Sequence, residues 1–314
     1  MYTPLVSVNI ICYNQAPFLK QRIDSVLQQT YFDFELLIWD DASTDDSKKI
    51  IEQYRGHNRV SEIIYNSFNS GNGYTQWQDA IEKCQSKYLW IAEGDDFAEP
   101  SFLKQAVKIL EENPTAALVE TDAYYIENNL PASLVSEHKN ITFSKALWTK
   151  DFVMKGEDAI LDILAHGNCI ANVSNVLFRA DVLKQLHFNF SGYKYSADWF
   201  LYINLFKKFD YAYLHQPLSY FRLHSDNATK KGRASGKALQ ENFSIINEII
   251  PYLKQHEKYN NHYIKSVNRY ITIFGVPFSS KISLLVYYLT TNFSLAIKGL
   301  YYNFKSRFGK NNHA

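Results

Sequence analysis

Short hydrophobic runs and longer helical patterns alternate along the first 120 residues of the chain. Runs rich in Val, Ile, Leu and aromatic residues, each bounded by turn residues, predict strands at residues 6–12, 34–39, 61–66, 88–92 and 116–120. Between the first two runs, Leu19, Ile23 and Val26 repeat at helical spacing. Strand–helix–strand repetition predicts an α/β fold with a mostly parallel sheet that helices cover on both faces.

The pattern weakens from about residue 125 to residue 170, where we expect a long excursion over the sheet. Ser43-Thr-Asp-Asp46 has the form of a capping box that opens a helix. Further elements are predicted as helices at 157–165, 180–186 and 198–209, and strands at 173–178 and 211–214. We therefore expect one α/β domain at 1–232 and a helical region at 233–314.

The helical region carries an apolar stripe and a strong positive charge. Apolar residues recur every three to four positions over residues 281–308, which predicts an amphipathic helix. No acidic residue follows Glu257, whereas eight Lys and Arg residues do, so the last 57 residues carry a charge of +8. Because the whole chain carries +1, the first 257 residues carry −7. The helix either lies on the anionic inner face of a membrane or folds onto the α/β domain with a solvated basic face.

Composition excludes several other classes of protein. With 314 residues, 46% hydrophobic and 21% charged, the chain can bury one large or two modest cores. A net charge of +1 argues against a nucleic-acid partner held by a global basic field. Cys12, Cys84 and Cys169 are too few for a disulfide framework, which favours the cytoplasm. We expect neither a signal peptide nor a spanning helix, so the sequon Asn172-Val-Ser is read as chance.

Polar and acidic residues follow three of the predicted strands. They are Tyr13-Asn14, Asp40-Asp41 and Glu93-Gly-Asp95-Asp96. Because ligands of parallel sheets bind beyond the carboxyl ends of the strands, these residues are expected to meet in one crevice. Adjacent carboxylates repel each other unless a cation compensates them, which suits Mg²⁺ or Mn²⁺. The alternative is that Asp95 or Asp96 only caps the following turn.

The second of these strand ends has the chemistry to hold a nucleobase. A carboxylate at Asp41 can accept a hydrogen bond from a base imide, and Tyr13 offers an aromatic face for stacking. In the alternative interpretation, Asp41 is a turn residue and Tyr13 packs like most of the 23 tyrosines.

Four segments within the first 96 residues resemble glycosyltransferase family 2, and weaker similarity continues to about residue 230. The segments are Val6-Ser-Val-Asn-Ile-Ile-Cys-Tyr-Asn14, Ser25-Val-Leu-Gln-Gln-Thr-Tyr31, Trp39-Asp-Asp-Ala-Ser-Thr-Asp45 and Ile91-Ala-Glu-Gly-Asp-Asp96. The resemblance implies a GT-A fold and an inverting, metal-dependent hexosyl- or N-acetylhexosaminyltransferase. It also implies a nucleotide-sugar donor, with a UDP-sugar as the first expectation. The acceptor would be a glycan or lipid-linked saccharide in cell-surface polysaccharide biosynthesis.

The same resemblance implies roles for the acidic strand ends. Tyr13 would pack on the base, Asp41 would hydrogen-bond it, and Asp40 would lie in the same cleft. Glu93-Gly-Asp95 takes the place of the family's metal-binding Asp-x-Asp, with Asp95 as the main ligand of Mn²⁺ or Mg²⁺. Asp96 would be a neighbour near the donor sugar.

Two later segments complete the resemblance. Asp198 matches the family's catalytic base, although Ala197 replaces the usual neighbour, and its alternative role is a helix N-cap. Tyr220-Phe-Arg-Leu-His224 resembles the family's Tyr-Arg-x-His ending. Arg222 would then neutralise diphosphate charge, and His224 would contact the metal or diphosphate, although a lone loop histidine is more often structural.

Two other functions compete with this interpretation. A sugar nucleotidyltransferase also uses carboxylate-bound metal, but it places a Gly-rich basic loop after the first strand, and residues 12–17 contain neither Gly nor Lys. A non-catalytic nucleotide-sugar-binding module is disfavoured because all the acidic positions are present.

Overall fold

The computed structural model describes residues 2–143, 145–223, 236–255, 278–294, 296–298 and 300–301. The chain divides into two compact units. The first contains Met1–Glu157, Ile170–Gly192 and Asn204–Leu223, and the second contains Asp158–Cys169, Tyr193–Ile203 and His224–Ala314. The expected domain boundary at residue 232 lies outside the described residues.

The described residues form one ten-stranded sheet in the first unit, with the order β3-β2-β1-β4-β9-β6-β10-β5. Two further strands lie off this path, because β7 pairs with β6 and β8 pairs with β10. The strands are β1 (Val6–Cys12), β2 (Phe34–Asp40), β3 (Val60–Tyr65), β4 (Tyr88–Glu93), β5 (Phe97–Ala98), β6 (Ala116–Glu127), β7 (Leu130–Leu134), β8 (Phe152–Met154), β9 (Val176–Arg179) and β10 (Asp210–Arg222).

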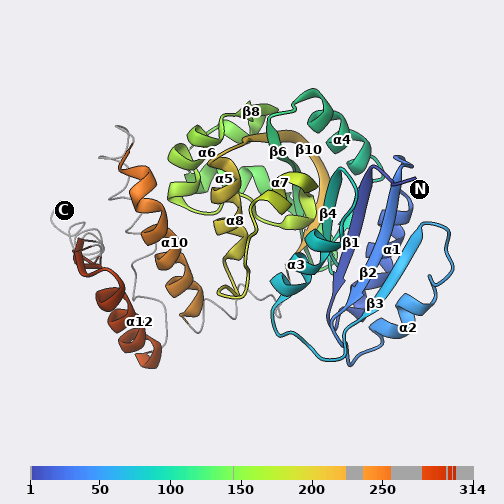
Figure 1. The fold of residues 1–314 in the computed structure, drawn as a ribbon, viewed down its shortest axis with the longest axis horizontal. Helices are drawn as coiled ribbons and strands as arrows, with labels where there is room; N and C mark the ends of the chain where they lie inside the picture. Colours follow the sequence, from blue (N-terminus) through green and yellow to red (C-terminus); the bar gives the residue numbers. More distant parts are fainter. Residues whose placement is uncertain are drawn as a thin grey trace. The chain divides into compact units, whose positions relative to one another are not determined.

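The α/β class is confirmed, and the sheet is mixed. Strands β3, β2, β1 and β4 pair in parallel, as do β6 and β10, and the blue strands β1 to β3 lie side by side in Figure 1. Strands β5, β7, β8 and β9 pair antiparallel with their neighbours. A tight turn at Asn128 and Asn129, with φ of 51° and 64°, reverses the chain between β6 and β7.

Helices cover the sheet because its central strands are apolar on both faces. The first unit contains α1 (Ala16–Leu27), α2 (Ser47–Glu52), α3 (Gly73–Lys83), α4 (Phe102–Glu112), α5 (Val135–Phe143), α7 (Ala180–Gln185) and the 3₁₀ turns η1 (Leu147–Thr149) and η3 (Val173–Asn175). Every residue of β1 is buried, as is typical of a strand covered on two sides. One face of β1 shares a core with α1 and α4, and α3 packs on β1 and β4.

Several predicted elements differ from the structure. The strand predicted at 116–120 continues to Glu127 because β10 and β7 extend its pairing. Residues 173–175 form a 3₁₀ turn, and the strand begins at Val176. The expected excursion between 125 and 170 contains β7, α5 and β8.

The predicted capping box at 43–46 does not form. Helix α2 begins at Ser47, and Asp46 makes no side-chain capping bond. The Asp45 carboxylate instead accepts a hydrogen bond from the Ser47 N–H at 2.9 Å, so a shorter Asx-type turn opens this helix.

In the second unit, α10 (Lys237–Leu253) and α12 (Phe278–Thr291) are helical, as expected. Two helices contain residues of both units: α6 (Gly156–Asp162) and α8 (Ala197–Phe206). The 3₁₀ turn η2 (Leu164–His166) belongs to the second unit. The Glu241 carboxylate of α10 accepts hydrogen bonds from the N–H groups of Lys194, Tyr195 and Ser196. Within the described ranges, no helix has the length and apolar character needed to cross a membrane.

Candidate active site

The loops that follow β1 and β2 are joined by hydrogen bonds at the carboxyl edge of the sheet. The Asn14 N–H donates to Ser43 Oγ at 2.9 Å, and Asn14 Oδ1 accepts from the Thr44 N–H at 2.8 Å. The Ala16 N–H donates to Asp45 Oδ2 at 2.9 Å. Asn14 adopts φ of 52°, a left-handed conformation that asparagine tolerates. These bonds fix the backbone on both sides of Tyr13.

The residues predicted to bind a nucleobase lie on these loops in different environments. The Tyr13 side chain is exposed, whereas Asp40 and Asp41 are buried. Asp41 Oδ1 accepts from Asn66 Nδ2 at 2.7 Å, and its Oδ2 accepts from Ser70 Oγ at 2.7 Å. Asp41 therefore holds the loop after β3 against the end of β2.

Asp40 has a different set of partners from Asp41. Its Oδ2 accepts from the Ser43 N–H at 3.1 Å, while its buried Oδ1 makes no hydrogen bond with any described residue. A buried acceptor without a donor is costly, so this oxygen is a candidate to receive a hydrogen bond from water or a ligand.

The acidic loop, residues 93–96, follows β4 and lies against the end of β1. The Gly94 N–H donates to the Ile11 carbonyl at 2.9 Å. A Cβ atom at Gly94 would collide with the Gln15 side chain and lie 3.2 Å from the Ile11 carbonyl oxygen. A side chain at position 94 would therefore require the Gln15 side chain to move and the contact with β1 to loosen, so the glycine favours this close approach of the acidic loop to β1.

Both carboxylate oxygens of Asp96 have protein partners. Oδ1 accepts from the Arg222 N–H at 3.0 Å, and Oδ2 accepts from Asn172 Nδ2 at 2.7 Å. Burial, and then the neighbouring charge of Asp95, raise the pKa of Asp96 to about 6. Asp96 thus connects the acidic loop to β10 and to the Asn172 turn.

The Asn172 turn, residues 172–175, was missed by sequence reasoning. Ser174 Oγ accepts from the Glu93 N–H at 3.0 Å, and the Ser174 carbonyl accepts from Trp90 Nε1 at 2.8 Å. Asn175 Nδ2 donates to the Thr121 carbonyl of β6 at 2.8 Å. The turn therefore supports the acidic loop at Glu93 and, through Asn172, at Asp96.

Arg22 of α1 is a fully buried cation close to the acidic loop. Its Nε donates to the Glu93 carbonyl at 2.9 Å, and its Cζ lies 5.1 Å from the centre of the Trp90 ring. Burial lowers the pKa of Arg22 to about 10, whereas Asp96, Asp95 and Glu93 act to raise it. The buried positive charge opposes the mutual repulsion of the three carboxylates.

Arg222, predicted beside a diphosphate, is buried among protein groups. Its Cζ lies 4.8 Å from the centre of the Phe18 ring and 5.1 Å from that of Phe97. Its guanidinium donates to Asn129 Oδ1 at 3.1 Å and to Gln21 Oε1. Burial lowers the pKa of Arg222, while Asp96 and Asp95 act to raise it. Arg222 thus connects the end of β10 to α1 and to the turn after β6.

Asp198, the predicted base, belongs to the second unit. Helix α8 begins at Ala197, so Asp198 lies inside the first turn of the helix and not at an N-cap before it. Asn168 Nδ2 donates to Asp198 Oδ2 at 2.7 Å, which orients the carboxylate. His224, predicted to contact the metal or diphosphate, lies outside the described residues.

The acidic loop offers oxygen ligands for a hard cation, but it does not form a complete cage. Among the described residues, no group of three or more His, Cys, Asp and Glu side chains could hold a metal ion. Mg²⁺ is commonly held by one or two carboxylates together with substrate phosphates and water. Glu93 and Asp95 therefore fit a metal whose remaining ligands come from a bound diphosphate.

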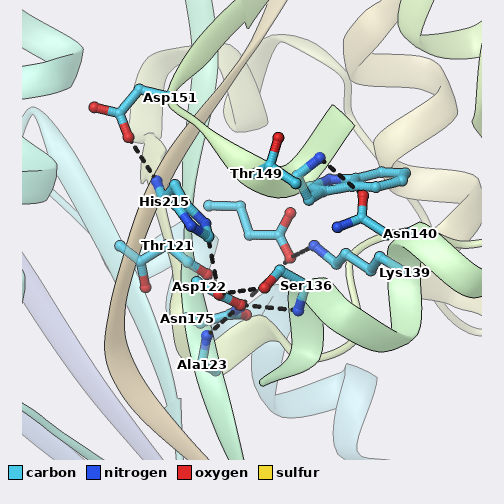
Figure 2. Close-up of polar contacts among 12 residues, drawn as sticks. Thr121, Asp122, Ala123, Ser136, Lys139, Asn140, Thr149, Asp151, Asn175 and His215 are labelled. Atoms are coloured by element: carbon cyan, nitrogen blue, oxygen red, sulfur yellow. Dashed lines mark hydrogen bonds and ion pairs between the residues drawn. The ribbon is translucent and has the colours of Figure 1, made fainter. Parts of the chain in front are cut away.

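A second polar group, the β6 cluster, lies beside Asn175, the last residue of the Asn172 turn (Figure 2). It consists of Glu120, Asp122, Ser136, Lys139 and His215. Lys139 of α5 forms a buried ion pair with Glu120, and Asp122 Oδ2 accepts from Ser136 Oγ at 2.6 Å. Asp122 Oδ2 lies 3.8 Å from His215 Nδ1. Sequence reasoning placed Glu120 at the end of an apolar strand and assigned it no partner.

The mixed sheet with acidic loops at the carboxyl ends of its strands matches the expected GT-A fold, and the solved structures show the same fold. The crystal structure of S. aureus TarS 1–349 in complex with UDP-GlcNAc has a TM-score of 0.64 and 15% sequence identity, covering 97% of this chain and 92% of that chain. The mannosyltransferase PcManGT from Pyrobaculum calidifontis, in complex with GDP-Man and Mn²⁺, has a TM-score of 0.57 and 16% identity, covering 98% and 84%. These likenesses confirm the fold.

The model of glycosyl transferase family 2 matches residues 7–186, more than half of the chain, and the chain belongs to this family. An uncharacterized glycosyltransferase of Methanocaldococcus jannaschii is 31% identical over 131 residues, covering 41% of this chain and 45% of the relative. Bacillus subtilis TuaG, a glycosyltransferase assigned to teichuronic acid biosynthesis, is 26% identical over 147 residues, covering 46% and 58%. The chain thus matches these curated relatives over about half of their length.

Proposed function

We propose that the chain is an inverting glycosyltransferase that moves a sugar from a nucleotide-sugar donor to a hydroxyl of a glycan or lipid-linked glycan. The acidic loop carries this proposal, because it places Glu93 and Asp95 beside the loop of Tyr13 in a chain of this family. The proposed role is cell-surface polysaccharide biosynthesis, with the sugar transfer taking place in the cytoplasm. The assignment of TuaG to teichuronic acid biosynthesis supports the biosynthetic role.

The proposed donor is a UDP-sugar, with a hexose or an N-acetylhexosamine as the sugar. The UDP-GlcNAc bound to TarS supports this choice, while the GDP-Man bound to PcManGT keeps GDP-sugars as a comparison. Tyr13 stacks on the base, and Asp41 hydrogen-bonds it through one of the carboxylate oxygens that Ser70 and Asn66 orient. Asp40 lies in the same cleft, where its unpaired Oδ1 accepts a hydrogen bond from the donor nucleotide or from water.

Asp95, with Glu93, holds Mn²⁺ or Mg²⁺ in this proposal. When bound, such an ion stabilises the negative charge that develops on the diphosphate as the bond to the sugar breaks. Asp96 keeps the acidic loop in place near the donor sugar through Asn172 and the Arg222 backbone. Arg222 adds positive charge near the diphosphate, and His224 is a further candidate contact.

Asp198 is the proposed general base. Its carboxylate, oriented by Asn168, removes the proton of the acceptor hydroxyl as that oxygen attacks the anomeric carbon. Attack from the face opposite the leaving diphosphate inverts the anomeric configuration in one displacement, so no covalent sugar–enzyme intermediate is needed.

The metal-dependent step is tested with Asp95→Ala. We expect this change to weaken calorimetric binding of a UDP-sugar in the presence of Mn²⁺ by at least about tenfold, or about 1.4 kcal/mol. Binding without metal should change little. Asp181→Ala, an exposed aspartate on α7, is the matched control. Unchanged affinity of the Asp95 variant with Mn²⁺ would remove Asp95 from this role.

The base is tested with Asp198→Asn, which keeps the size of the side chain and its contact with Asn168. We expect kcat to fall by about 10²–10⁴, the usual contribution of a positioned base, while donor affinity stays close to that of the wild type. Release of the nucleoside diphosphate in the presence of acceptor measures turnover. A variant that retains most of its turnover would assign the base elsewhere.

A further inference from the structure

Helix α12 has one buried face and one exposed face. Leu284, Tyr288 and Ala296, on the helix and the helical turn that follows it, are completely buried. They recur at intervals of four and eight residues, which places them on one side of the helix. This side packs on α10 within the second unit.

Specific contacts fix which side of α12 faces α10. The rings of Phe243 and Tyr288 have centroids 4.6 Å apart, and the hydroxyl groups of Ser244 and Tyr287 form a hydrogen bond. Asn292 Nδ2 donates to Asn247 Oδ1 at 2.7 Å. Two amides and two hydroxyls paired in this way make a rotated packing of the helix unfavourable.

The opposite side presents an exposed apolar stripe. Its members are Ile282 and Val286 of α12 and Phe293, Ile297 and Tyr301 of the helical residues beyond it, which are between 47% and 65% exposed. They follow each other at intervals of four and seven residues, the spacing of one helix face, and the Asn292 and Ala296 N–H groups donate to the Tyr288 and Asn292 carbonyls across the end of α12. The other large exposed hydrophobic side chains of the described chain are scattered over its loops and strands and over α5.

Charge decides which kind of partner fits this stripe. Lys281 lies on α12 and Lys298 on the helical residues that follow it, and eight Lys and Arg residues follow Glu257 without a single acidic residue. A second copy meeting the stripe through a twofold axis would bring two such basic segments together, which like-charge repulsion opposes. An anionic surface complements the segment instead.

We propose that the exposed apolar stripe of α12 binds the surface of an anionic phospholipid membrane. The helix lies in the headgroup region of the membrane. Its apolar side chains enter the boundary between headgroups and acyl chains, and Lys281 and Lys298 lie near lipid phosphates. One face of α12 thus packs on α10 within the helical region, while the other face binds lipid. This inference goes beyond the proposed chemistry and does not depend on it.

Vesicle flotation of the full chain tests the proposal. We expect binding to vesicles of phosphatidylcholine mixed with phosphatidylglycerol, weak binding to phosphatidylcholine alone, and weaker binding at high salt. Val286→Glu/Phe293→Glu should reduce binding to the anionic vesicles by at least about tenfold, since it introduces charge into the inserted face. Ile141→Glu/Phe32→Glu exchanges an aliphatic and a phenyl side chain, each more than 70% exposed, and should bind like the wild type.

A second variant separates lost insertion from altered charge. Val286→Ser/Phe293→Ser keeps the net charge and should also lose binding, and circular dichroism with thermal unfolding checks that each variant is folded. Equal vesicle binding by wild type and both stripe variants overturns the proposal. A concentration-dependent dimer in light scattering that the stripe variants lose, without vesicle binding by the wild type, would assign the stripe to a second copy.

Discussion

Asn172 carries no charge, yet it holds a carboxylate of the acidic loop in place. Its Nδ2 donates to Asp96 Oδ2, and its Oδ1 accepts from the Ser174 N–H at 2.7 Å. One amide therefore both shapes the turn and supplies a donor to a buried oxygen.

Replacing this amide should affect both stability and ligand affinity. Asn172→Ala leaves Asp96 Oδ2 buried without its donor, which should lower the free energy of unfolding by about 1–3 kcal/mol in chemical denaturation. Because Asp96 borders Asp95, the metal-dependent part of UDP-sugar binding should weaken as well. A variant that loses stability but keeps full metal-dependent affinity would show that Asn172 is only structural.

At this scale the sequence predicts the charged residues better than those that position them. The acidic loop is visible because an apolar strand runs directly into carboxylates. Asn172 and Arg22 are not visible, since their partners are 76 and 71 residues away in the chain. A lone polar residue gives no local sign of such a contact.

Among the elements, α5 and β6 are held together by the buried pair of Lys139 and Glu120. The Lys139 ammonium also lies 5.5 Å from the centre of the Trp148 ring and 5.1 Å from that of Tyr213. The Tyr211 hydroxyl donates to the same carboxylate. Several elements of the first unit therefore meet at one ion pair.

Breaking this pair should destabilise the fold strongly. Lys139→Met leaves the Glu120 carboxylate buried without its cation, and we expect a loss of about 3–5 kcal/mol in the free energy of unfolding. Adding Glu120→Gln should restore much of that loss, since the remaining group is neutral. Equal stability of the single and double variants would mean that the pair is not coupled.

The effect of Lys139→Met should depend on pH. Burial raises the pKa of Glu120, although Lys139 and Tyr211 act to lower it. A carboxyl group with a raised pKa on folding stabilises the folded state at low pH and loses that contribution as the pH rises through its folded pKa. Removal of Lys139 raises this pKa further, so the destabilisation should be largest near neutral pH and shrink toward about pH 4.

The elements that the sequence predicts best are those with local patterns. Strands β1, β2 and β4 are apolar runs with turn residues on both sides, and they appear where expected. The second half of β6 was not predicted, because it depends on pairing with β10 about 95 residues later, where the register shifts around Pro217. Such long-range pairing has no signature in a short window.

For the molecule as a whole, the charge is divided along the chain between an acidic major part and a basic end. A net charge of +1 hides this division, and the exposed apolar stripe of α12 lies within the basic end. If the proposed function and the lipid surface are both right, membrane binding raises the local concentration of a lipid-linked acceptor.

This arrangement predicts a selective loss of activity. Val286→Glu/Phe293→Glu should lower transfer to a lipid-linked acceptor in anionic vesicles by at least about tenfold, because surface binding no longer concentrates the enzyme. Transfer to a water-soluble acceptor analogue should be unchanged, and Ile141→Glu/Phe32→Glu is the control for both assays. An equal loss with the two acceptors would point to damage of the chemistry itself.

The close approach at Gly94 limits how the acidic loop can vary. In a library containing all substitutions at residues 93–96, Ala at position 94 should be tolerated only where Gln15 moves away, and larger side chains should be depleted, because a Cβ there overlaps Gln15 Oε1 and lies 3.2 Å from the Ile11 carbonyl oxygen. Position 93 should accept Asp, since both acidic residues offer oxygen ligands. In such a library, metal affinity should therefore depend mainly on the carboxylates on either side of residue 94, while residue 94 itself affects how closely the acidic loop approaches β1.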